Sequence, residues 1–133
     1  MTRLDHVGIP VRDLERSKKF YCELLGFEEY CSVDMDLPIM SGVVFLKRDD
    51  LMIEFHVTRG DVWGEKPAGR QWGIIHLAFL VDDIEKEFDR FRAAGYVNTT
   101  PLGYSSEIKG TEEYRRYVYF AGPDGELIEL RGK

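Results

Sequence analysis

Two histidines and two glutamates stand out in this sequence as residues that could bind a metal ion. His76 follows His6 by 70 positions, and Glu129 follows Glu54 by 75 positions. Imidazole nitrogens and carboxylate oxygens are ligands that Zn, Ni, Co, Fe and Mn ions accept. Taken singly, such a histidine is more often a hydrogen-bonded structural residue, and a strand glutamate is often solvated. Four such residues in two matched pairs predict instead one divalent metal ion per site.

An internal repeat relates the two pairs. Segment 6–15 (HVGIPVRDLE) matches segment 76–85 (HLAFLVDDIE), and segment 43–55 (VVFLKRDDLMIEF) matches segment 118–130 (VYFAGPDGELIEL). Each segment of the first match predicts a strand followed by a helix, and each segment of the second match predicts a hairpin. The offset grows between the two matches. The second copy therefore carries about five extra residues, which we place in the polar stretch 99–113.

Local signals divide each copy in the same way. Asp13 and Asp83 can cap two segments with apolar residues at helical spacing, which predict helices over 13–25 and 83–94. A strand, a helix and three strands therefore occur twice, which is an α+β fold of tandem βαβββ modules. The expected organisation is a single domain over 1–133, with module 1 at about 1–60, a Gly-containing linker at 61–72 and module 2 at about 73–133.

Strand alternation places the four candidate ligands on the sheet faces opposite the helices. Neighbouring residues of a strand point to opposite faces, so a histidine or glutamate next to an apolar row faces away from that row. The predicted helix-facing rows are Val7, Ile9 and Val11; Leu51, Ile53, Phe55 and Val57; Ile75, Leu77, Phe79 and Val81; and Ile128 and Leu130. Glu54 and Glu129 interrupt apolar runs at the same register, where burying an unpaired carboxylate would be costly.

Other polar residues are weaker candidates for contacts with a substrate. His56 and Arg131 follow the two glutamates by two positions, so they share the predicted face, and Arg131 could hold a carboxylate or a phosphate. Tyr119 could line the same cavity, and Tyr104 could belong to a lid over it. Solvated strand ends and aromatic packing are the alternative interpretations of these residues.

Composition excludes several kinds of partner. The chain has 133 residues, a formal net charge of −6 and a pI near 5.1, which argues against nucleic acid and anionic membranes and favours a small-molecule substrate. The apolar stretch 74–81 is too short to span a bilayer. The first six residues lack the apolar run of a secretory signal, so we expect a cytoplasmic protein. Cys22 and Cys31 indicate neither a disulfide framework nor an activated nucleophile.

Several motifs together resemble one known superfamily. They are LDHVGI at 4–9, FY at 20–21, LLGF at 24–27 and PDGELIEL at 123–130. With the tandem module, they resemble the vicinal oxygen chelate superfamily, which includes glyoxalase I, methylmalonyl-CoA epimerase, extradiol dioxygenases, and fosfomycin- and bleomycin-resistance proteins. The resemblance implies an open, U-shaped eight-stranded sheet with the helices outside and the metal ion inside.

The resemblance also implies a ligand set. In that family the ligands come from the first and last strands of each module, which here carry His6, Glu54, His76 and Glu129. The complete set is most similar to bacterial-type glyoxalase I, whereas the dioxygenases use three ligands, which His6, His76 and Glu129 could also provide. The first strand lacks the Arg that glyoxalase I uses toward glutathione, which argues against a glutathione adduct as the substrate.

The implied reaction is a proton transfer next to a carbonyl group. The metal ion would act as a Lewis acid on a substrate with vicinal oxygens, and Glu129 would act as the base, with Glu54 able to share that task. This predicts a metal-dependent isomerase or lyase. An extradiol-type dioxygenase and a small-molecule binding or antibiotic-resistance protein are the alternatives. Open sheet edges in so short a chain also predict a homodimer.

Overall fold

The computed structural model describes residues 2–60, 73–104 and 113–133. The chain forms two compact units, Met1–Ala68 and Gly69–Lys133. Each unit contains a four-stranded mixed sheet and follows the element order βαβββ. The predicted α+β fold with a repeated module is therefore confirmed.

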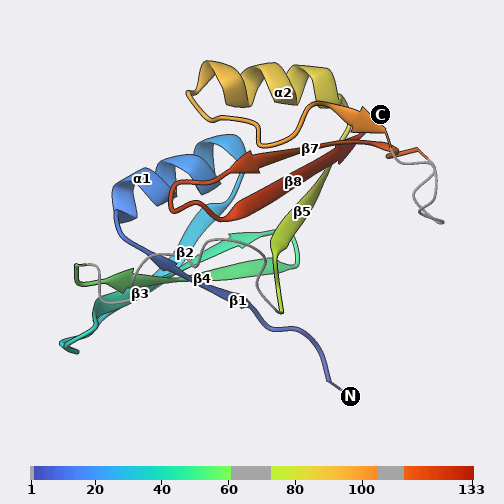
Figure 1. The fold of residues 1–133 in the computed structure, drawn as a ribbon. Helices are drawn as coiled ribbons and strands as arrows, with labels where there is room; N and C mark the ends of the chain where they lie inside the picture. The colour runs from blue at the N-terminus through green and yellow to red at the C-terminus, as the bar shows by residue number, and fades with distance from the viewer. Residues whose placement is uncertain (1, 61–72, 105–112) are drawn as a thin grey trace. The chain divides into compact units, whose positions relative to one another are not determined.

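The first unit is built around a sheet with the strand order β1-β4-β3-β2 (Figure 1). Strand β1 runs parallel to β4, and the other neighbours are antiparallel. The carboxylate of Asp13 accepts a hydrogen bond from the Arg16 backbone N–H at 3.0 Å and caps the helix as predicted. The elements are β1 (Val7–Val11), α1 (Leu14–Lys18), η1 (Lys19–Leu24), β2 (Glu28–Asp34), β3 (Met40–Arg48) and β4 (Leu51–Thr58).

The first predicted helix, over 13–25, forms in two parts. The α-helical part ends at Lys18, and the chain continues without a break as the wider π-helical segment η1. Gly26 then takes a left-handed conformation with a φ of 73°, which a residue with a side chain rarely adopts. The helix therefore stops where the sequence pattern placed its end.

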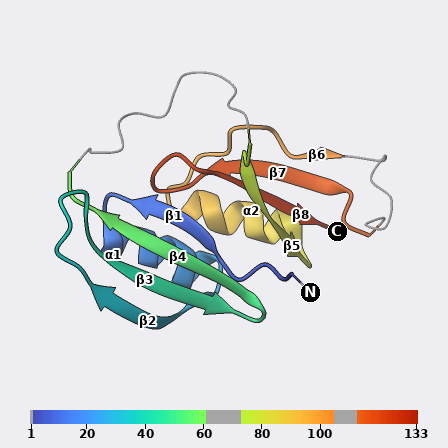
Figure 2. The same ribbon diagram turned by 90° about the horizontal axis from the view of Figure 1, so that it is seen from below.

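The second unit repeats this plan with the strand order β5-β8-β7-β6 (Figure 2). Strand β5 is parallel to β8, and the carboxylate of Asp83 accepts a hydrogen bond from the Lys86 backbone N–H at 3.0 Å. The extra residues predicted at 99–113 fall partly outside the described residues, as does the whole predicted linker 61–72. The elements are β5 (His76–Val81), α2 (Ile84–Ala93), β6 (Gly103–Tyr104), β7 (Arg116–Ala121) and β8 (Leu127–Gly132).

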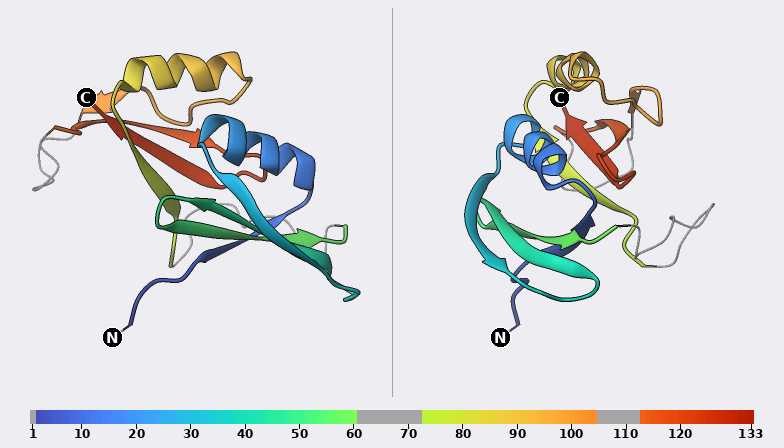
Figure 3. Two further views of the ribbon diagram at one scale, coloured as in Figure 1. Left: turned by 180° about the vertical axis from the view of Figure 1, so that it is seen from behind. Right: turned by 90° about the vertical axis from the view of Figure 1, so that its left-hand side faces the viewer.

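In each unit the helix lies over one face of the sheet (Figure 3), and buried apolar side chains form a core between them. In the first unit, the fully buried ring of Tyr21 packs edge-on against Phe55 with their centroids 5.2 Å apart. In the second unit, Phe91 of α2 packs on Phe120 at 4.9 Å. These contacts confirm that Phe55 faces the helix, so that Glu54 lies on the opposite face of β4. The prediction for Ile75 is wrong, because β5 begins only at His76 and Ile75 is exposed.

The arrangement of the two units as a single domain with an open U shape stays a prediction. None of the helices in the described ranges is long and apolar enough to cross a membrane.

Candidate metal centre

His6 and Glu54 form the first predicted pair. The Nε2 atom of His6 lies 3.1 Å from Oε2 of Glu54. The parallel register of β1 and β4 places Gly8 beside Glu54, and His6 lies two residues before Gly8 on the same face. The Glu54 side chain is only 17% exposed. A carboxylate in such a position requires a polar or cationic partner, which His6 supplies.

The His6 ring is held on two further sides. Its Nδ1 atom lies 2.7 Å from a carboxylate oxygen of Asp5. The ring also packs edge-on against Phe45, the residue opposite Glu54 on β3, with centroids 5.6 Å apart. The hydrogen bond to Asp5, with smaller contributions from the charges of Glu54 and Asp5, raises the pKa of His6 above its usual value. Asp5 thus favours the orientation in which Nε2 is directed at Glu54.

A second imidazole reaches the same carboxylate. The Nε2 atom of His56 lies 2.9 Å from Oε2 of Glu54, the same oxygen that His6 approaches. The sequence pattern indicated that His56 could contact the substrate, whereas the structure places it against a candidate ligand. A Cβ atom at Gly8 would lie 3.4 Å from Nε2 of His56, an ordinary van der Waals distance, so the imidazole lies directly beside Gly8.

His76 and Glu129 form the second predicted pair in the same way. The Nε2 atom of His76 lies 3.1 Å from Oε2 of Glu129, whose side chain is 11% exposed. Ala78 lies beside Glu129 in the parallel register of β5 and β8, and His76 again lies two residues earlier. In both repeats, the same register between two parallel strands therefore brings a histidine next to a glutamate.

Tyr119 occupies the position that Phe45 occupies in the first unit. It lies opposite Glu129 on β7, and its ring packs edge-on against His76 with centroids 5.3 Å apart. Burial raises the pKa of Tyr119, and the charge of Glu129 and a hydrogen bond to that carboxylate raise it further. The phenol therefore stays protonated at neutral pH and presents to Glu129 a hydroxyl that the phenyl ring of Phe45 lacks.

Arg131 brings a positive charge to the second pair. Its Nε atom lies 3.9 Å from Oε1 of Glu129, and its Nη2 atom donates to the Tyr114 carbonyl oxygen at 3.0 Å. By contrast, the buried Nδ1 atom of His76 has no hydrogen-bond partner among the described residues. His76 therefore lacks the support that Asp5 gives His6.

The chemistry of both pairs fits a divalent transition-metal ion. Two ligand atoms, each about 2.1 Å from one ion and at roughly a right angle, are about 3 Å apart, close to the distance observed in each pair. Over the described ranges, no group of three or more His, Cys, Asp or Glu residues is arranged so as to hold a metal ion. Each unit thus presents a half-site of two donors with compatible spacing and charge.

The remaining candidates lie outside these pairs. Tyr104 is exposed and accepts a hydrogen bond from Arg115 at 3.2 Å, while the neighbouring residues 105–112 of its predicted lid are outside the described part of the chain. Burial raises the pKa of Cys22, which disfavours the reactive thiolate and agrees with the expectation that it is not a nucleophile.

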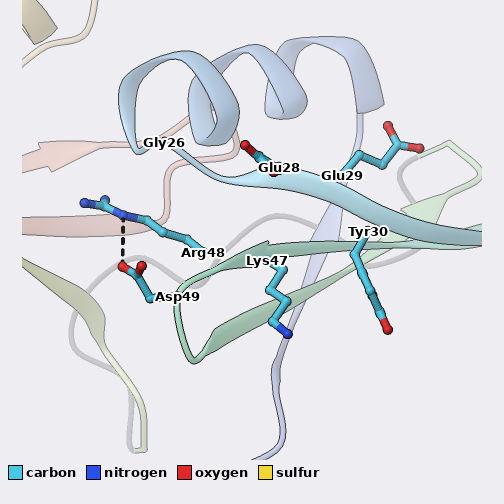
Figure 4. Close-up of a pocket in the computed structure, with 7 residues that line it drawn as sticks. All are labelled: Gly26, Glu28, Glu29, Tyr30, Lys47, Arg48 and Asp49. Carbon is cyan, nitrogen blue, oxygen red and sulfur yellow. Dashed lines mark ion pairs between the residues drawn. The ribbon is translucent and has the colours of Figure 1, made fainter.

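A polar pocket of 570 Å³ lies elsewhere in the first unit (Figure 4). None of the predicted site residues lines it, and no sequence motif marked it. Among its charged groups, Arg48 lies 3.9 Å from Asp49, and Glu29 lies 2.7 Å from Lys18 outside the pocket. Its lining residues are Gly26, Glu28, Glu29, Tyr30, Lys47, Arg48 and Asp49.

Comparisons with known proteins agree with this architecture. Residues 3–130 match the profile of the Glyoxalase/Bleomycin resistance protein/Dioxygenase superfamily. The chain is 31% identical to YwbC of Bacillus subtilis over 96% of this chain and 95% of that protein. It is 30% identical to a probable lactoylglutathione lyase of Vibrio cholerae over 96% of this chain and 88% of that protein. The crystal structure of a glyoxalase family protein from Enterococcus faecalis is similar over 97% of this chain and 96% of that chain, with a TM-score of 0.76 and 26% identity.

Proposed function

Because the chain belongs to the glyoxalase, bleomycin resistance protein and dioxygenase superfamily, we propose that it is a metal-dependent isomerase or lyase. It moves a proton next to a carbonyl group of a small substrate with vicinal oxygens. The observation that supports this reaction class is the occurrence of one largely buried His–Glu contact in each repeat, at the same register of two parallel strands. A protein that only sequesters a small molecule has no need of two such pairs.

The proposed ligands of one divalent ion are His6, Glu54, His76 and Glu129. The ion is Ni, Co, Zn, Mn or Fe, all of which accept mixed imidazole and carboxylate ligands. When bound, it acts as a Lewis acid toward the negative charge that develops on the substrate oxygens. Each pair offers only two donors, so the proposed site combines both pairs, either from one chain or from two copies of it.

Glu129 is the proposed base of the proton transfer. Tyr119 lies opposite Glu129 on the neighbouring strand, and the guanidinium of Arg131 lies 3.9 Å from Oε1. These contacts hold the carboxylate in one orientation, which allows it to remove a proton from one carbon and return it to the next. Glu54 is able to share this task from the other pair.

Arg131 and Tyr119 are also the proposed contacts for the substrate. The guanidinium of Arg131 brings a positive charge to within 3.9 Å of Oε1 of Glu129, beside the proposed site. A carboxylate or phosphate on the substrate would match its charge. Tyr119 would contribute its ring edge beside His76.

Metal analysis and isotope exchange test the proposal together. Protein purified without chelator should contain Ni, Co, Zn, Mn or Fe in a defined stoichiometry. In D₂O, the metal-loaded protein should exchange the carbon-bound proton of a vicinal-oxygen substrate, with methylglyoxal and its hemithioacetals as the first probes and proton NMR as the readout. Protein that binds none of these ions would contradict the proposal. A Glu129→Gln variant with normal exchange would contradict the assignment of the base.

A ring-cleaving dioxygenase is the second candidate. His6, His76 and Glu129 would form a set of two histidines and one carboxylate, which suits Fe(II) and oxygen. Oxygen uptake by the Fe(II)-loaded protein with catechol, together with no proton exchange, would favour this reaction over the isomerase.

A cytoplasmic homodimer is the proposed form of the protein. Strand β2 pairs with β3 on one side only, and all seven of its residues are exposed, so it offers an open sheet edge. Sedimentation at dilute concentration measures the assembly. If the ligands come from two copies, dilution to the monomer should release the metal ion.

A further inference from the structure

His56 makes a contact for which the proposed ligand set has no role. Its Nε2 atom lies 2.9 Å from Oε2 of Glu54, slightly closer than Nε2 of His6 at 3.1 Å. Both imidazoles thus approach one oxygen of one carboxylate. Within the described residues, the other oxygen of Glu54, Oε1, has no polar partner.

Metal binding by His6 would change this arrangement. A nitrogen that coordinates an ion gives its lone pair to that ion and cannot also donate a hydrogen bond to Glu54. The hydrogen bond of His6 to Oε2 would then be lost, whereas the hydrogen bond of His56 to the same oxygen could persist and keep the carboxylate in place.

For His6 to bind the ion while His56 keeps its hydrogen bond to Glu54, the two imidazoles must carry their protons on different nitrogen atoms. Asp5 accepts from Nδ1 of His6 at 2.7 Å, which leaves Nε2 of His6 bare for the ion. The carboxylate of Glu54 is an acceptor, so His56 has to carry its proton on Nε2. The surroundings of the two rings favour opposite tautomers.

The local packing provides for the His56 contact, and the second unit lacks it. The imidazole lies directly beside Gly8, where a Cβ atom would be in ordinary van der Waals contact with Nε2 at 3.4 Å. At the equivalent places, the second unit has Ala78 beside the glutamate and Arg131 two residues after it. Arg131 stays 3.9 Å from its carboxylate. The imidazole donor is therefore specific to Glu54.

We infer that His56 is a positioning residue: its Nε2–H group holds Oε2 of Glu54 and thereby fixes the orientation in which this carboxylate would bind the ion. This inference rests on the proposed function, because it assumes that Glu54 is a metal ligand. It assigns His56 to Glu54 and not to the substrate. Hydrogen bonds to ligating carboxylates commonly change metal affinity by about 10- to 100-fold.

Two substitutions at His56 separate the effect of its hydrogen-bond donor from the effect of its ring. In His56→Gln, the side-chain amide can place an N–H group near the position of Nε2, whereas His56→Phe keeps a ring without a donor. Met52→Leu is the matched control, since Met52 lies on the same face of β4 two residues before Glu54 and cannot donate. Competition with a chromophoric chelator for Zn²⁺ measures the affinity of each full-length variant.

The expected result is a loss of about 10- to 100-fold in Zn²⁺ affinity for His56→Phe, with His56→Gln and Met52→Leu each within about threefold of wild type. Equal losses in the Gln and Phe variants would overturn the inference, because a direct ligand or a packing role would then explain His56. Unchanged affinity in the Phe variant would also overturn it.

Nitrogen-15 NMR of the imidazoles gives a readout that does not depend on metal affinity. In both the metal-free and the Zn²⁺-loaded protein, His56 should show a protonated Nε2. A bare or zinc-shifted Nε2 of His56 would refute the inference. If the wild-type protein binds no Zn²⁺, Ni²⁺ or Co²⁺, the proposed function fails, whereas normal binding with the wrong tautomer of His56 refutes only the positioning role.

Discussion

The two repeats use the same pair of residues but surround it differently. In each, a histidine meets a glutamate at 3.1 Å and packs edge-on against an aromatic ring. Glu54 is contacted by two imidazoles, and the aromatic ring beside it is that of Phe45, which carries no hydroxyl. Glu129 is contacted by one imidazole and the phenol of Tyr119, with a guanidinium nearby.

The repeated backbone therefore brings a histidine to a glutamate in both units. Individual neighbouring residues determine which polar groups contact each carboxylate. The parallel register is shared by both units, so it cannot distinguish the two carboxylates. The residue opposite each glutamate and the residue two places after it do so. We expect the pair with Glu129 to perform the proton transfer and the pair with Glu54 to hold the ion.

The largest expected effect is the loss of turnover in Glu129→Gln. The amide keeps an oxygen for the ion but accepts no proton, so turnover should fall by about 10²- to 10⁴-fold, with a smaller loss of metal. Glu54→Gln should reduce turnover less. Proton exchange and metal content measured on both variants decide this, and a larger loss of turnover in Glu54→Gln would reverse the assignment of roles.

Removal of an imidazole from either repeat should weaken metal binding. His6→Ala and His76→Ala each delete a proposed ligand, so we expect each to lower affinity by more than about 100-fold, beyond the range of changes around a ligand. Turnover should fall with metal content. Equilibrium dialysis with Co²⁺ measures both variants side by side. A normal affinity in either one would show that its pair does not contribute to the site.

A smaller effect should follow from removing the hydroxyl that Phe45 lacks. Tyr119→Phe deletes a hydrogen bond to a carboxylate, which should cost about 1.5–3 kcal/mol of unfolding free energy at neutral pH. Because the pKa of Tyr119 is raised in the folded protein, its contribution is present below pH 10, the usual tyrosine value, and is lost as the pH rises through the raised value.

Urea unfolding of wild type and Tyr119→Phe between pH 7 and 11 measures this contribution. The stability difference between the two proteins should shrink above pH 10. Phe45→Tyr is the matched control in the other repeat. A difference that stays constant up to pH 11 would show that the phenol makes no stabilising hydrogen bond in the folded state.

The smallest effect is expected at Asp5. Its side chain is 79% exposed, so solvent screens its interaction with His6. Asp5→Asn should therefore lower Zn²⁺ affinity only about two- to tenfold, less than the roughly 10- to 100-fold changes seen for buried groups around metal ligands. Within the described residues, Nδ1 of His76 has no equivalent partner, and Ile75→Asn should leave affinity unchanged. Chelator competition on both variants provides the comparison, and equal effects would remove the proposed difference between the two imidazoles.

Local sequence patterns were sufficient to predict the repeated module and the residues that form both His–Glu pairs. Period-two alternation requires that Glu54 and Glu129 point away from apolar neighbours such as Phe55 and Ile128, and the matching of the two copies places His6 and His76 on the corresponding strands. These are local properties, so pattern alone predicted them. The strand limit at Ile75 was missed, because alternation does not show where pairing between strands begins.

The groups that surround each carboxylate could be identified only from the three-dimensional structure. Sequence placed His56 and Arg131 on the right faces, but both follow their glutamate by two positions and could not be told apart by pattern. The structure brings His56 to 2.9 Å from Glu54 beside Gly8 and leaves Arg131 at 3.9 Å from Glu129. The physical reason is that such contacts depend on strand register and side-chain conformation, which join residues far apart in the chain.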